Sequence, residues 1–61
     1  MTKKELKKLA KEIANYERTY QNTSDYELKE KARDKITELS EKVYDLNDLM
    51  ILDSFIQDYL N

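Results

Sequence analysis

The 61-residue sequence contains no cysteine, no histidine, no glycine and no proline. Without cysteine the chain has no disulfide bonds, which small domains often use to compensate for a small core. Without histidine it lacks both the commonest metal ligand and the usual side chain for proton transfer near neutral pH. We therefore expect no metal and no other cofactor, and we expect stability to come from helix packing or from association with another chain.

The absence of glycine and proline also bears on the fold class. Tight turns in a small β-rich domain usually need glycine, because their backbone has positive φ angles, whereas helix interiors need neither residue. Charged residues make up 39 % of the chain, but the net charge is only −2. Mixed charge of this kind is typical of a solvated helical surface, whereas disordered tails usually have a high net charge. The composition predicts an all-α protein with a single domain.

Long hydrophobic runs are missing as well. The longest apolar run, Leu49-Met50-Ile51-Leu52, is far shorter than the roughly 20 residues that cross a bilayer. The lysine-rich N-terminus is not followed by the apolar stretch of a secretory signal peptide. We expect a cytoplasmic protein without membrane attachment.

Capping signals and apolar spacing predict three helices, at about residues 3–21, 25–45 and 48–60. The first begins with a capping box, in which the Thr2 hydroxyl and the Glu5 carboxylate each bond to the other's backbone N–H. Its apolar residues follow at alternating gaps of three and four, which places them on one face of a helix. They are Leu6, Leu9, Ile13, Tyr16 and Tyr20.

A second capping box, from Ser24 to Glu27, predicts the start of the next helix. The connection between the two helices is short, which favours antiparallel neighbours. The apolar face of the second helix comprises Leu28, Ala32, Ile36, Leu39, Val43 and Leu46.

The apolar spacing shifts by one residue after Leu46, a rotation of about 100° on a helix. Asp45 and Asn47 lie at this shift, and short polar residues favour helix caps over helix interiors. We predict a break with one of these two residues capping a third helix, which gives a small three-helix bundle. The alternative is a helical hairpin whose long second helix is kinked near residue 46.

The third predicted helix is apolar around about half of its circumference, which is more than one packing surface requires. This excess predicts that the C-terminal helix forms an interface, either in a homodimer or with another protein. The residues expected in the core and this interface are Leu49, Met50, Ile51, Leu52, Phe55, Ile56 and Tyr59.

A set of cations projects from the first helix opposite its apolar face, and we call it the basic face. It comprises Lys4, Lys7, Lys8, Lys11 and Arg18. One interpretation is a solvated surface; another is a docking strip for phosphate, anionic lipid or an acidic protein. Nucleic-acid binding is a further possibility for such a face. Because the whole chain is acidic, whereas nucleic-acid-binding domains are typically basic, a nucleic-acid-associated regulator is the less favoured function.

Catalytic groups are scarce in this sequence. No nucleophile and base of the common kinds are present, since there is neither histidine nor cysteine. We also expect a bundle of this size to lack a pocket of the roughly 300 Å³ that small-molecule sites usually occupy. The sequence therefore favours a non-enzymatic interaction or regulatory module without a small-molecule substrate.

The pattern from Leu6-Lys7-Lys8-Leu9-Ala10-Lys11-Glu12-Ile13 through Leu49-Met50-Ile51-Leu52-Asp53 resembles short uncharacterised helical proteins of low-GC Gram-positive bacteria and their phages. That resemblance implies an all-α fold and no particular active residues. Helical-hairpin phosphatases that act on sporulation response regulators have a Ser-x-x-x-Asp signature on their second helix. The corresponding residues here are Ala32 and Ile36, so this activity is not expected.

Overall fold

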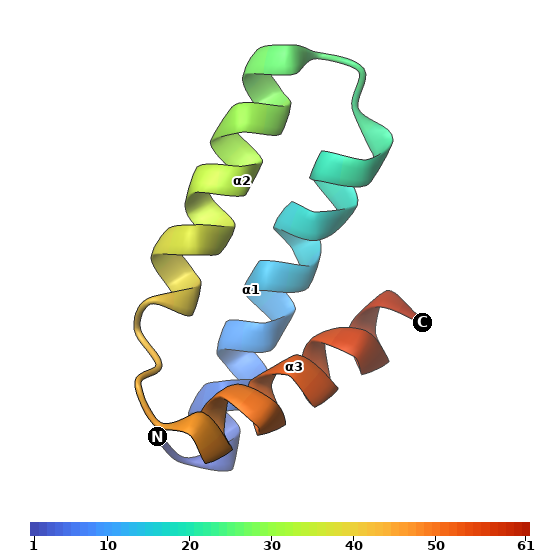
Figure 1. The fold of residues 1–61 in the computed structure, drawn as a ribbon. Helices are drawn as coiled ribbons and strands as arrows, with labels where there is room; N and C mark the ends of the chain where they lie inside the picture. The colour runs from blue at the N-terminus through green and yellow to red at the C-terminus, as the bar shows by residue number, and fades with distance from the viewer.

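Three α-helices account for most of the computed structural model, which describes all residues from 1 to 61 (Figure 1). Helix α1 spans Lys3–Asn22, α2 spans Tyr26–Ser40 and α3 spans Leu46–Leu60. This arrangement confirms the all-α, three-helix prediction. It also rules out the alternative of one kinked helix, because an extended residue, Asp45, separates α2 from α3.

The predicted capping box at the start of α1 is present. The Glu5 backbone N–H donates to the Thr2 hydroxyl oxygen at 3.2 Å, and the Thr2 backbone N–H donates to the Glu5 carboxylate at 3.1 Å. The Thr2 hydroxyl donates to the same carboxylate at 3.0 Å. These bonds favour the ionised carboxylate, so the pKa of Glu5 lies below its ordinary value of 4.5.

The cap of α2 differs from the prediction by one residue. Asp25 is the N-cap, and its carboxylate accepts from the Glu27 backbone N–H at 3.0 Å. Ser24 does not form the predicted capping box. The Thr23 hydroxyl accepts from the Asp25 backbone N–H at 3.1 Å, which fixes the extended residues before the helix. Aspartate is as good a cap as serine, so local sequence did not distinguish the two neighbours.

Helix α2 ends at Ser40, so the predicted extension to residue 45 is wrong. A turn follows the helix, in which the Val43 backbone N–H donates to the Ser40 carbonyl at 3.2 Å. Val43 is buried, as its spacing predicted, but it reaches the core from a loop. Leu46 was expected on the apolar face of α2 and is instead the first residue of α3. Asp45 caps α3 by accepting from the Asn47 N–H at 2.8 Å.

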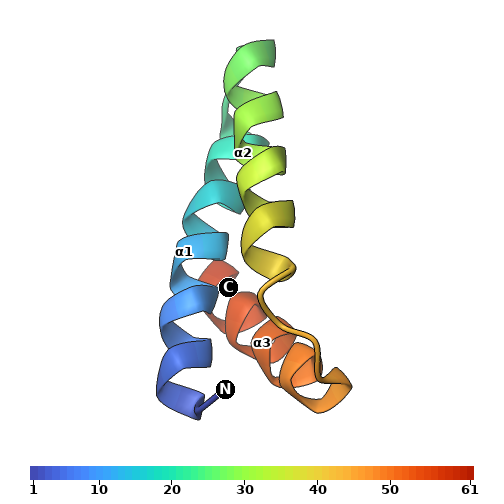
Figure 2. The ribbon, with the colours of Figure 1, turned by 90° about the vertical axis from the view of Figure 1, so that its left-hand side faces the viewer.

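Helix α1 lies between the other two helices and contacts both of them. Helix α2 runs antiparallel to α1, as predicted, while α3 crosses the N-terminal half of α1 obliquely (Figure 1). No Cα atom of α2 lies within 8 Å of one in α3. The two helices diverge from the loop that joins them, as both views show (Figures 1 and 2). The bundle is therefore open between α2 and α3.

The core is small and entirely apolar. Most of it comes from α1, which contributes five of the nine buried residues, whereas Leu52 is the only buried residue of α3. Leu28, predicted on the apolar face of α2, is exposed. The buried residues are Leu6, Leu9, Ala10, Ile13, Ala14, Ala32, Leu39, Val43 and Leu52.

The open arrangement leaves the surface of the molecule unusually large. A compact monomer of 7.4 kDa is expected to expose about 4,200 Å², whereas this chain exposes 4740 Å². Its radius of gyration is 11.6 Å, against about 10.5 Å for a compact chain of this length. Both quantities indicate that the three helices pack less compactly than is usual for a chain of this size.

Candidate docking surface

A depression of about 700 Å³ lies where α2 turns into α3. Four of its seven lining residues are hydrophobic, and they come from the end of α2, the connecting loop and the start of α3. The lining residues are Ile36, Thr37, Ser40, Glu41, Val43, Tyr44 and Leu49.

A second depression, of about 510 Å³, continues along the gap between α2 and α3. It shares Ile36 and Ser40 with the first, so the two depressions are adjacent, and we call them together the trough. Helix α1 forms its floor through Ile13. The second depression is lined by Ile13, Glu17, Gln21, Ile36, Ser40, Asp53, Ile56, Gln57, Leu60 and Asn61. The expectation that the bundle lacks a hollow of 300 Å³ was wrong, because α3 packs beside α1 and leaves α2 uncovered.

The charge of the trough is entirely acidic. Glu17, Glu41 and Asp53 line it, one each from α1, the end of α2 and α3, and no lysine or arginine does. None of these three carboxylates has an ion-pair partner, since the two ion pairs of the structure join other residues. A ligand of the trough therefore meets apolar side chains on the floor and negative charge on the walls.

The seven interface residues predicted on α3 divide between two sides of that helix. Leu52 faces α1 and is 3 % exposed. Leu49 and Ile56 are half-buried and line the trough. Ile51, Phe55 and Tyr59 do not line it; the first two are half-buried and pack against the core, and Tyr59 is exposed.

Exposed apolar side chains gather at the start of α3. Tyr44 is 91 % exposed, Leu46 71 % and Met50 65 %. Tyr44 lines the trough, whereas Leu46 and Met50 lie one turn apart on the same face of α3 and do not line it. Of these, only Met50 was predicted as an interface residue. Leu46 was missed because its spacing extends the apolar face of α2, whereas it is the first residue of α3.

All five residues of the basic face are exposed, as predicted, but two of them hold α3 in place. The Lys7 ammonium lies 5.5 Å from the centre of the Phe55 ring, a cation–π contact. The Arg18 guanidinium donates to the backbone carbonyl of Tyr59. The remaining cations, Lys4, Lys8 and Lys11, make no hydrogen bond or ion pair.

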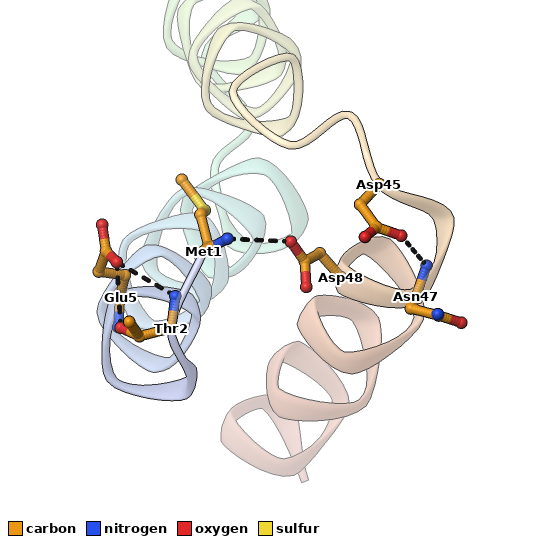
Figure 3. A network of polar contacts seen from close by, with 6 residues as sticks. All are labelled: Met1, Thr2, Glu5, Asp45, Asn47 and Asp48. Carbon is orange, nitrogen blue, oxygen red and sulfur yellow. Dashed lines mark hydrogen bonds and ion pairs between the residues drawn. The ribbon is translucent and has the colours of Figure 1, made fainter.

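Polar contacts also fix the start of α3 beside the start of α1 (Figure 3). The N-terminal ammonium group of Met1 forms an ion pair with the Asp48 carboxylate at 3.1 Å. On the far side of the same turn, the Asp45 carboxylate points at the Asn47 backbone (Figure 3). The Met1–Asp48 ion pair joins α3 to the N-terminus ahead of α1, and near the other end of α3 the Arg18–Tyr59 hydrogen bond joins it to α1.

No polar or charged side chain is buried, and no three acidic side chains gather closely enough to hold a metal ion. The lowered pKa of Glu5 is accounted for by its capping bonds with Thr2. None of the helices combines the length and the apolarity needed to cross a bilayer.

No protein-family model matches the sequence, and neither the curated proteins nor the solved structures yielded a match. The class of the protein rests on its fold: it is a small all-α three-helix bundle. The feature that sets its surface apart is the trough between α2 and α3.

Proposed function

We propose that this protein is a non-enzymatic protein-interaction module and that the trough is its docking surface. The observation that carries the proposal is the separation of α2 from α3, with partly buried apolar side chains in the gap. A bundle that served only as a folded scaffold would gain stability by closing this gap, since apolar burial contributes about 25 cal/mol per Å².

The free side of α3 supports the same function. Leu46 and Met50 are exposed one turn apart on the same face of α3, and contiguous exposed apolar residues of this kind mark sites of protein–protein contact. The wide apolar surface of α3 predicts an interface on this helix, and its residues Leu49 and Ile56 line the trough. Self-association through α3 stays a prediction of the sequence.

A nucleic-acid-associated regulator is the weaker candidate. Two of the five cations of the basic face contact α3, which leaves three lysines on the outer surface of α1. Three phosphate contacts would give weak binding that is lost as salt rises.

Selection of helical peptides on the immobilised protein tests the docking function. The probe is a display library of amphipathic helices with a fixed leucine stripe and with flanking positions drawn equally from Lys, Glu, Gln and Ser. Ser40 is half-buried and is shared by both ends of the trough, so Ser40→Tyr fills the hollow. Ser54→Tyr is the matched control, because Ser54 is exposed on α3 outside the trough.

Peptides recovered on the unmodified protein are expected to lose binding to the Ser40→Tyr variant and to keep it with Ser54→Tyr. Circular dichroism has to show that both variants are folded. Enrichment of no peptide, or equal binding to both variants, would refute the trough as the docking surface.

A further inference from the structure

We infer that the partner in the trough is an amphipathic α-helix whose apolar stripe is flanked by lysine or arginine. This inference rests on the proposed function and adds the chemistry of the partner. It draws on the shape of the trough, its charge and the surface that a second copy of the chain has to offer.

The shape of the trough fits a helix. Its floor and walls carry Ile13 from α1, Ile36 from α2 and Ile56 from α3, so apolar contacts converge from three directions. Helices that dock in a groove place residues spaced three and four apart against such a floor. On α3 the lining residues run from Leu49 to Leu60, which corresponds to a wall about 17 Å long, or roughly three turns of a bound helix.

The charge of the trough determines which residues are favoured on either side of the apolar stripe of a bound helix. The carboxylates of Glu17, Glu41 and Asp53 border the apolar floor on three sides and lack ion-pair partners. An uncharged or acidic helix would desolvate these groups without compensating them, whereas cations beside its apolar stripe would pair with them.

A second copy of this chain does not have that chemistry to offer. No lysine or arginine lines the trough, so packing one trough against another in a two-fold dimer would bring two acidic surfaces together. The cations of the chain lie on α1, on α2 and at Lys42, and the buried apolar residues of both helices are packed in the core. A distinct, basic helix is therefore the occupant that complements the trough.

The flanking residues of the selected peptides test this inference separately from the docking function. We expect the recovered peptides to be enriched in lysine at the flanking positions relative to the starting library. For the best peptide of about 18 residues, replacing its flanking lysines with glutamates should weaken binding roughly tenfold or more at low salt, because each exposed ion pair contributes about 1.4- to 5-fold. The difference should shrink as ionic strength rises.

Charge reversal in the protein supplies the matched comparison. Asp53→Lys should reduce affinity for the lysine-flanked peptide and raise it for the glutamate-flanked one. Asp58→Lys makes the same change on α3 outside the trough and should leave the preference unaltered. Neutral or acidic flanks, or equal effects of the two variants, would overturn the basic partner while leaving the docking function standing. Concentration-dependent dimerisation that Ser40→Tyr abolishes would identify a second copy as the occupant instead.

Discussion

Replacing Leu52 with alanine removes the one fully buried side chain of α3. Truncating a buried leucine costs about 2–5 kcal/mol, because apolar contacts are lost and a cavity remains. A chain of 61 residues is expected to have an unfolding free energy of only about 3–9 kcal/mol. We therefore expect Leu52→Ala to remove a large part of the total stability, and a loss of even 2 kcal/mol should lower Tm by roughly 8–16 °C.

The natural control is Leu46→Ala, the same substitution in the same helix at a residue that is 71 % exposed. This variant should change the unfolding free energy by no more than about 0.5 kcal/mol. Urea denaturation followed by circular dichroism measures both changes. Equal midpoints for the two variants would refute the packing of α3 on α1 through Leu52, and with it the separation of α2 from α3.

Three further outcomes follow from the same structure. Phe55→Ala should cost less than the roughly 3–5 kcal/mol typical of a fully buried ring, because Phe55 is only half-buried; a cost at the top of that range in urea denaturation would contradict this exposure. Because the pKa of Glu5 in the folded protein lies below its ordinary value of 4.5, its ionised form stabilises the fold above that pH, and this contribution is lost as pH falls through the lowered pKa. The advantage of the unmodified protein over Glu5→Gln in urea should therefore narrow on acidification, and a pH-independent advantage would count against the capping bonds. Fluorescence anisotropy with generic duplex DNA should detect no saturable binding even at low salt, whereas steeply salt-dependent binding would favour the nucleic-acid function.

Features that depend on neighbouring residues were predictable from the sequence. The Thr2 capping box and the buried face of α1 both follow from local spacing, and Asp45 was one of two expected caps for α3. The cap of α2 was misplaced by one residue, because Ser24 and Asp25 are both good caps and only the position of the Glu27 N–H distinguishes them.

Features that depend on how the helices meet were not predictable. Val43 continues the apolar spacing of α2 although it lies in a loop. Its side chain is nevertheless buried, because the burial of an apolar side chain does not require a helical backbone. The trough depends on α3 lying across α1, away from α2, a choice that the contacts of Lys7 and Arg18 with α3 support. Lys7 and Arg18, which the sequence indicates only as members of a charged surface, thus help to set the shape of the candidate site.

Mapping a selected helical peptide by amide chemical shifts tests the central claim most directly. On titration into the ¹⁵N-labelled protein, we expect the largest changes at amides along the trough, namely Ile36, Ser40, Leu49 and Ile56. Changes centred on the basic face of α1, with the trough amides unmoved, would contradict the account.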